Sequence, residues 1–260
     1  MLCFLNRNYL NRLFHEGTGM KLSSIFHKSP DIWDNSIHRN VFVNMVSHYK
    51  QKTEKPIILS DENFSLNAKF FNFSEAQKGV SPRLLMQHLI KLSDLTKYLG
   101  FSGIKVLMTV REQSTWLASR YAQSAYTMQN ACQLDFVNRV KKIIKVKDVK
   151  DTKFEWLNYL TVKKMYQDGL GINMIKVISM EELRDKPVNF IKNLDQFLNT
   201  KGQLIKWVST DVITTNKSSR GINANRWILN LEGKKEHITL SGELVTMIEK
   251  SYCDQSTKLV

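Results

Sequence analysis

Arg111 and Ser119 have the types and the spacing of residues that bind a phosphate group. Arg111 directly follows the apolar run 104–110, and Ser119 lies eight positions later in a segment with a helical pattern of apolar residues. A guanidinium group offers paired hydrogen-bond donors, and a helix N-terminus adds backbone N–H groups and a favourable dipole. Ser119 would contribute a hydroxyl donor from the helix. The alternative interpretation is structural, with Arg111 in a salt bridge and Ser119 packed in a tight helix contact.

The segments around this pair predict an α/β fold. Three short apolar runs, at 56–59, 104–110 and 174–180, are typical of buried strands. Helical patterns separate them, and the alternation of strand and helix predicts a parallel sheet covered by helices. We therefore expect the three runs to be parallel neighbours in one sheet. Ligands of such sheets bind at the carboxyl ends of the strands, which is where Arg111 stands.

Local signals predict several element boundaries. Ser81-Pro82 predicts a helix start and Gly100 its end, because serine caps a helix and proline fits its first turn. A helix at 154–166 is expected to end at Asp168-Gly169. Glu181 and Glu182, after the third strand, are expected to cap the next helix. Further helices are expected at 35–49, after Arg111, at 187–198 and around Trp227, Ile228 and Leu231, and a strand at Met1–Leu5.

Three segments in register with one another resemble the sulfotransferase family, in particular its bacterial and carbohydrate-acting members. The pattern strand–Arg–x7–Ser–x–Tyr at Arg111, Ser119 and Tyr121 is similar to the family's 3′-phosphate-binding segment. Segments 57–65 and 177–198 resemble its strand–Ser-Asp-Glu and strand–Glu-Asp-Leu stretches, so the resemblance spans residues 55–200. It implies a three-layer parallel sheet flanked by helices, a P-loop NTPase-like sulfotransferase fold, in a single domain over residues 1–260.

The resemblance also implies an activity. A sulfuryl group would move from 3′-phosphoadenosine 5′-phosphosulfate, the co-substrate, to an acceptor hydroxyl such as one of a carbohydrate, with no metal required. Arg111 and Ser119 would hold the 3′-phosphate, and Glu62 would remove the acceptor proton, with Asp61 the second choice. In-line transfer needs such a base beside the nucleophilic oxygen. The alternative for Glu62 is a loop carboxylate paired with a nearby Lys or Arg.

Two loops of the family match this chain less closely. A late polar loop with Lys217, Arg220 and Gly221 is similar to the family's basic loop over the 3′-phosphate; the alternative is a solvated loop. The 5′-phosphosulfate loop, G-x-x-K-S/T-G-T-T/S, has only Gly17–Ser23 as a counterpart, with its residues in a different order. We therefore expect an N-terminally shortened member. The alternative function is an inactive relative that binds only the bisphosphate nucleotide.

The composition is that of a globular protein with a basic surplus. Lys plus Arg is 38 and Asp plus Glu is 24, which gives a net charge of +14. Such a charge attracts polyanions such as phosphorylated nucleotides; the alternative is a Lys-rich surface without a partner. A basic nucleic-acid-binding module is the third function considered, but no nucleic-acid motif accompanies the basic residues. With no membrane-span-length run, no secretory signal and three scattered cysteines, we expect a cytoplasmic protein.

Overall fold

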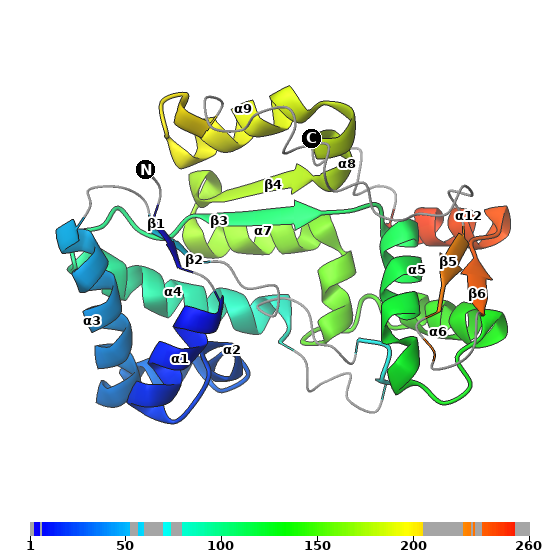
Figure 1. Cartoon of the computed structure of the whole chain (residues 1–260), viewed down its shortest axis with the longest axis horizontal. Coiled ribbons are helices and arrows are strands. Elements are labelled where there is room, and N and C mark those ends of the chain that lie inside the picture. Colours follow the sequence, from blue (N-terminus) through cyan, green and yellow to red (C-terminus); the bar gives the residue numbers. More distant parts are fainter. Residues whose placement is uncertain are drawn as a thin grey trace. The chain divides into compact units, whose positions relative to one another are not determined.

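The structure is a computed structural model, and it describes residues 3–5, 7–52, 57–59, 70–73, 80–204, 226–229, 231 and 236–252 (Figure 1). The chain divides into two compact units. The N-terminal unit comprises residues 1–106, 149–156 and 161–175, and the C-terminal unit comprises residues 107–148, 157–160 and 176–260.

The N-terminal unit combines helices with a two-stranded parallel ladder. Strand β1 (Cys3–Leu5) pairs with β2 (Ile57–Leu59), and Cys3 lies opposite Ile57. The strand predicted at the start of the chain is thus confirmed. The helices are α1 (Arg7–Thr18), α2 (Leu22–Ile25), η1 (Pro30–Asp34), α3 (Ser36–Lys52), α4 (Pro82–Tyr98), most of η5 (Lys153–Leu157), most of α7 (Tyr159–Leu170) and η6 (Ile172–Met174).

Aromatic side chains form much of the core of the N-terminal unit. The ring of Trp33 in η1 meets Phe14 of α1 and Phe42 of α3 edge-on, with ring centroids 6.3 Å and 5.8 Å apart. All three side chains are buried, and rings of this size contribute a large share of the hydrophobic stabilisation. Met45 and Val46 follow Phe42 at helical spacing on the buried side of α3. The helix predicted at 35–49 is therefore confirmed.

Helix α4 begins and ends where the local signals predict. The Ser81 hydroxyl accepts a hydrogen bond from the Leu84 N–H at 3.1 Å, and Pro82 occupies the first turn, where a missing N–H costs nothing. At the other end, Gly100 has a φ of +77°, a left-handed conformation that glycine adopts readily. Its N–H donates to the Lys97 carbonyl at 2.8 Å, which closes the last turn.

Helix α7 differs from the prediction at both ends. The expected helix at 154–166 is divided into η5 and α7, and α7 continues past Gly169 to Leu170. The left-handed residue that follows the helix is Gly171, with a φ of +106°. Gly169 instead permits a close approach to α4, because an added Cβ would lie 2.7 Å from the Met86 sulfur. Gly169 was predicted to end the helix, but it lies inside α7 at a position of close packing against α4.

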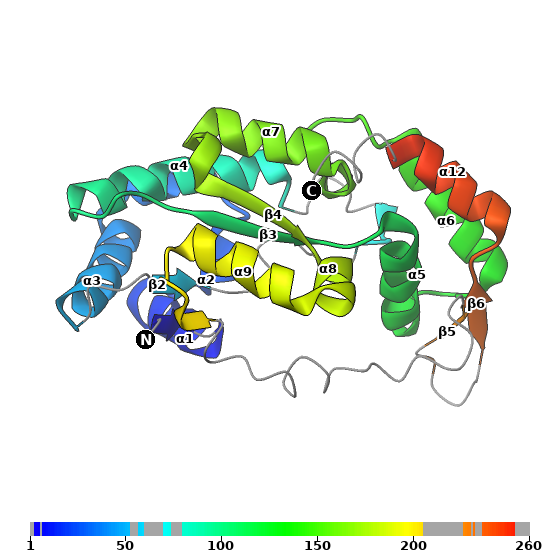
Figure 2. The same cartoon turned by 90° about the horizontal axis from the view of Figure 1, so that it is seen from above.

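The C-terminal unit contains a second ladder and a hairpin. Strands β3 (Val106–Val110) and β4 (Ile175–Ser179) are neighbours and point the same way, and α9 (Pro187–Leu198) lies alongside β4 (Figure 1, Figure 2). The other helices are α5 (Gln113–Ser124), η4 (Ala125–Thr127), α6 (Gln133–Lys145), α8 (Met180–Asp185) and α12 (Gly242–Tyr252). Within the described ranges, no helix is long and apolar enough to cross a membrane.

The predicted α/β organisation is confirmed in its coarser form, a mixture of helices and strands with small parallel ladders. The runs 104–110 and 174–180 contain the neighbours β3 and β4, as predicted. The run 56–59 differs, because in the described residues its strand β2 has β1 as its hydrogen-bonded neighbour. An apolar run identifies a buried strand, but it carries no information about which strand lies beside it.

The helix predicted around Trp227 is wrong. Residues Arg226–Ile228 form strand β5, which pairs antiparallel with β6 (His237–Thr239). Trp227 is half-buried and lies opposite the buried Ile238, whereas its neighbours Arg226 and Ile228 are exposed. This alternation has the period of a strand, and three residues are too few to distinguish it from a helical pattern.

Candidate functional site

The candidate site lies at the carboxyl ends of β3 and β4. Strand β3 ends at Val110 and α5 begins at Gln113, so Arg111 and Glu112 form the whole connection between them. Strand β4 ends at Ser179 and continues directly into α8. Because the two strands run in the same direction, both helices start at the same end of the ladder (Figure 1). This edge is where sheets with parallel strands bind their ligands.

One peptide group of this connection is held at both of its polar atoms. The Tyr159 hydroxyl, at the start of α7, donates to the carbonyl oxygen of Arg111 at 2.7 Å. The N–H of Glu112, on the other side of the same peptide bond, donates to Oε1 of Glu181 in α8 at 3.1 Å. Arg111 therefore leaves the strand from a fixed backbone position.

Glu181 is itself fixed by the start of α8. The Ser179 hydroxyl accepts from the Glu181 N–H at 3.0 Å and donates to Oε2 of the same residue at 2.5 Å. The expectation that Glu181 caps this helix is wrong, because Ser179 is the capping residue of α8. The other oxygen of Glu181 reaches Glu112. Glu182 accepts a hydrogen bond from the Asn193 amide of α9 at 3.0 Å, so it joins two helices.

Tyr159 is a hydrogen-bond donor throughout the physiological pH range. Only 7% of the residue is exposed. Burial raises the pKa of its hydroxyl well above the ordinary value, and the negative charges of Glu181 and Glu112 act in the same direction. Gln113 adds a further tie to this region, since its side-chain amide donates to the Leu157 carbonyl at 3.4 Å. The phenol therefore remains protonated and can hold the Arg111 carbonyl.

The first turn of α5 carries its own carboxylate. The Ser114 hydroxyl donates to Oε1 of Glu112, and the Thr115 hydroxyl donates to the Glu112 carbonyl at 3.0 Å. A carboxylate at a helix N-terminus interacts favourably with the helix dipole. Glu112 and Glu181 therefore bring two carboxylates to the connection between β3 and α5.

The two residues predicted to bind phosphate lie on one β3–α5 segment. Arg111 is half-buried at the end of β3, and Ser119 is half-buried in the second turn of α5. At 1.5 Å per residue, Ser119 is about 9 Å along the helix axis from Gln113. The structure therefore places both residues on one continuous strand–helix segment. The other predicted site residues, Asp61, Glu62, Lys217, Arg220 and Gly221, lie outside the described residues.

Gly17–Ser23, the nearest counterpart of a 5′-phosphosulfate loop, lies at the end of a helix. The N–H of Gly19 donates to the His15 carbonyl at 2.8 Å, and the Thr18 hydroxyl donates to the Phe14 carbonyl at 2.7 Å. These bonds end α1, and Gly19 has the left-handed φ of +72° that is common there. A helix C-terminus presents carbonyl oxygens, which repel a phosphate. Gly17–Gly19 therefore form a helix end, whereas Leu22 and Ser23 begin α2, so the segment does not have the strand–loop–helix order of the family's 5′-phosphosulfate loop.

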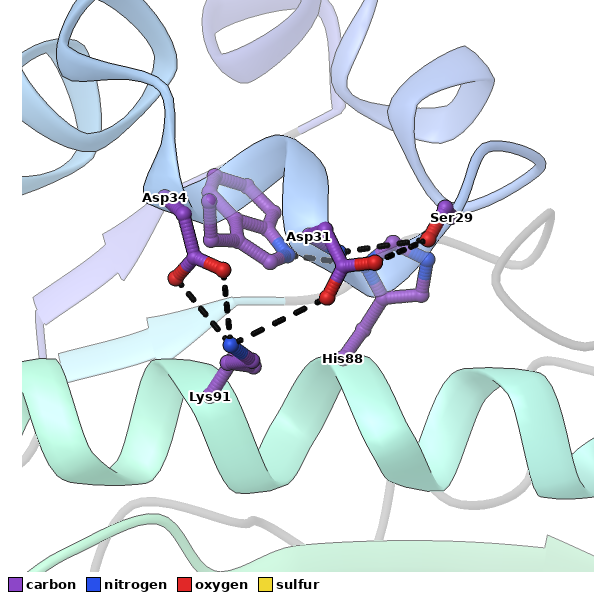
Figure 3. A network of polar contacts seen from close by, with 6 residues as sticks. Ser29, Asp31, Asp34, His88 and Lys91 are labelled. Atoms are coloured by element: carbon purple, nitrogen blue, oxygen red, sulfur yellow. Dashed lines mark hydrogen bonds and ion pairs between the residues drawn. The ribbon is translucent and has the colours of Figure 1, made fainter.

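A polar cluster in the N-terminal unit has a structural role. His88 of α4 is fully buried; its Nδ1 accepts from the Trp33 indole at 2.8 Å, and its Nε2 lies 3.0 Å from the Lys28 carbonyl. Lys91, one turn further along α4, points toward Asp34 of η1 at 2.8 Å and toward Asp31 at 3.9 Å (Figure 3). These contacts join η1 to α4 and leave no free polar atom on the His88 ring for a ligand.

The sequence did not reveal Tyr159 and Glu181 as parts of the site. Tyr159 is 48 residues from its partner Arg111, and Glu181 is 69 residues from Glu112. Neither position has a spacing or a neighbouring motif that indicates such a contact. The only signal was the place of Glu181 directly after a predicted strand end, the edge where ligands of parallel sheets bind.

No family model matches the chain, and neither a curated protein nor a solved structure shows a significant match to it.

Proposed function

We propose that this protein binds a 3′-phosphoadenosine nucleotide and acts as a sulfotransferase on an acceptor hydroxyl, such as one of a carbohydrate. One observation carries the proposal: Arg111 follows the carboxyl end of a strand in a parallel ladder, two residues before α5 begins. This is the position from which sheets of this kind bind phosphates. Under the proposal, the ladders belong to a three-layer, P-loop-like sulfotransferase fold.

The proposed reaction needs a base and a phosphate site. The acceptor oxygen attacks the sulfur of 3′-phosphoadenosine 5′-phosphosulfate while Glu62 takes its proton. The bond between sulfur and the 5′-phosphate oxygen breaks, and adenosine 3′,5′-bisphosphate leaves with the electron pair. Arg111 and Ser119 hold the 3′-phosphate throughout, assisted by the loop of Lys217, Arg220 and Gly221. These roles come from the resemblance in the sequence.

A second candidate function is binding of the bisphosphate nucleotide without transfer. It is favoured by Gly17–Gly19, which end α1 and so present carbonyl oxygens where the family has a phosphate-binding loop. Loss of even one preorganised donor typically slows catalysis by about 10²–10³-fold. A labelled-donor assay against a panel of glycans, run beside the variant Glu62→Gln, separates the two functions. Transfer that depends on Glu62 supports the enzyme, whereas binding without transfer supports the second candidate.

Calorimetry tests the phosphate site itself. We expect adenosine 3′,5′-bisphosphate to bind more tightly than adenosine 5′-phosphate, by about 10- to 150-fold if one charge-assisted contact is gained. Arg111→Ala should remove most of this preference. Arg226→Ala is the matched control, because Arg226 is an exposed arginine of the same unit whose guanidinium group lies 2.8 Å from Nδ1 of His237. Equal affinity for both nucleotides would show that Arg111 does not bind a 3′-phosphate.

A further inference from the structure

We infer that Tyr159 and Glu181 are positioning residues for Arg111, which they serve by holding the peptide group between Arg111 and Glu112. The inference rests on the proposed function, in which Arg111 binds the 3′-phosphate of a nucleotide. Neither residue touches the nucleotide in this assignment. Their effect passes through the backbone of the connection between β3 and α5 to the guanidinium group.

The geometry shows a peptide group fixed from two directions. Tyr159 reaches the Arg111 carbonyl oxygen at 2.7 Å from the start of α7, and Glu181 reaches the Glu112 N–H at 3.1 Å from the first turn of α8. Both atoms belong to the same planar peptide unit, so the two bonds together resist its rotation about the chain. Ser179 holds the second oxygen of Glu181 at 2.5 Å and thereby fixes the carboxylate.

The connection depends on these side chains because it is short. Arg111 and Glu112 lie between the last residue of β3 and the first residue of α5, where neither strand nor helix geometry sets the backbone. An arginine side chain is long, so a small rotation of its backbone displaces the guanidinium group several times farther than it displaces the backbone atoms. A displacement of about 1 Å at a binding group can cost about 10²-fold in rate. Holding the backbone therefore limits the positions that the guanidinium group can reach.

The same bonds determine which group is left for the nucleotide. Glu181 already occupies the N–H of Glu112, one of the backbone donors at the start of α5 that an anion would otherwise use. Because this donor is occupied, recognition of the 3′-phosphate relies more on the side chains of Arg111 and Ser119. Nucleotide selectivity is therefore the property that Tyr159 and Glu181 should control.

The test measures the ratio of the dissociation constants for adenosine 5′-phosphate and adenosine 3′,5′-bisphosphate in the full chain. Tyr159→Phe removes only the hydroxyl, and Tyr166→Phe is its control on the same helix, because the buried Tyr166 hydroxyl has no hydrogen-bond partner among the described residues. Glu181→Ala is compared with Glu181→Gln. Both variants lose the negative charge, but only the glutamine retains an oxygen that can accept from the Glu112 N–H.

We expect Tyr159→Phe to lower the ratio by about three- to tenfold, the size of one hydrogen bond, with little change in the affinity for adenosine 5′-phosphate. Tyr166→Phe should leave the ratio unchanged, and Glu181→Gln should keep a ratio that Glu181→Ala loses. Thermal unfolding shows whether each variant is folded.

Two results would overturn the inference while the proposed function stands. In the first, Tyr159→Phe and Glu181→Ala keep the ratio of the wild-type protein, whereas Arg111→Ala loses it. The other is an equal loss of affinity for both nucleotides, which indicates a general structural role. If the ratio is near one in the wild-type protein and does not change in Arg111→Ala, the proposed function is wrong. The inference, which rests on that function, is then wrong as well.

Discussion

The indole nitrogen of Trp33 donates a hydrogen bond to Nδ1 of His88 across 2.8 Å in the core of the N-terminal unit. This bond requires Nδ1 to be unprotonated, and Nε2 then carries the proton and donates to the Lys28 carbonyl at 3.0 Å. A second proton on the ring would face the indole N–H. The bond therefore makes the stability of this unit depend on the protonation state of a single histidine.

The first prediction is a pH dependence of folding that His88 causes. Burial lowers its pKa from the ordinary value of 6.5 to about 4, and the charge of His27 contributes to the same shift. Unfolding therefore takes up a proton between pH 6.5 and about 4, so the free energy of unfolding falls as the pH falls through this window. The loss from His88 should reach about 3 kcal/mol near the lower limit.

Urea unfolding of wild type and His88→Gln at several pH values checks this prediction. The difference in the free energy of unfolding between the two proteins isolates the contribution of His88. We expect the wild-type protein to be more stable than His88→Gln at neutral pH. The difference in their free energies of unfolding should become smaller as the pH falls. A gap that stays constant over this range would mean that His88 does not titrate on unfolding.

The second prediction concerns the packing of α1 on α3. Alanine is usually the better helix residue, and replacing a helical glycine with it gains about 1 kcal/mol. At Gly17 we expect the opposite, because an added Cβ would collide with Cγ2 of Val41, a branched side chain that has little freedom to move. Gly17→Ala should lower the free energy of unfolding by about 1–3 kcal/mol in chemical denaturation.

A double variant shows whether the collision is the cause of this loss. Val41→Ala removes the methyl groups that the new Cβ would meet, so Gly17→Ala should cost less in that background. Additive effects of the two substitutions would point to a different cause.

The third prediction tests the charge balance at the candidate site. Glu112 is exposed beside Arg111, and its carboxylate would repel a bound phosphate. Glu112→Gln should therefore tighten the binding of adenosine 3′,5′-bisphosphate by about two- to fivefold at low ionic strength. Salt screens exposed charges, so calorimetry at high ionic strength should show a smaller gain. Weaker binding in this variant would indicate that Glu112 itself contacts the nucleotide.

The fourth prediction concerns the loop after α9, which Asp195 organises. Its carboxylate accepts from the Thr200 hydroxyl at 2.5 Å and from the backbone N–H groups of Gly202 and Leu204 at 2.7 Å and 3.0 Å. An asparagine offers one acceptor oxygen in place of two. Asp195→Asn should therefore lower the melting temperature measurably. Asp185→Asn, which alters only an exposed ion pair with Arg184, should leave it nearly unchanged.

The sequence predicted those features that depend on neighbouring residues. Ser81 and Pro82 specify the start of α4 through their own side chains, and the apolar runs in β3 and β4 identify buried strands without any knowledge of their partners. The same local reasoning failed at Gly169, where a residue of α4 decides whether a glycine is needed. It also failed at Trp227, where pairing with β6 decides between strand and helix.

The candidate site shows the same division. Arg111 could be predicted as a phosphate ligand because a strand precedes it and a helix follows it. Tyr159 and Glu181 could not be predicted, because their contacts join segments that only the folded chain brings together. Patterns in a single sequence describe one element at a time, whereas these contacts join the β3–α5 connection to α7 and to α8.

The doubly held peptide between Arg111 and Glu112 also bears on the order of folding. Its two partners are 48 and 69 residues away along the chain, and contacts of such long sequence separation form only after the intervening segments have become compact. The amide hydrogen of Glu112 should consequently exchange with solvent when the contact between Glu112 and Glu181 opens. The exchange rate of this amide therefore measures how often the backbone opens at the position from which Arg111 extends.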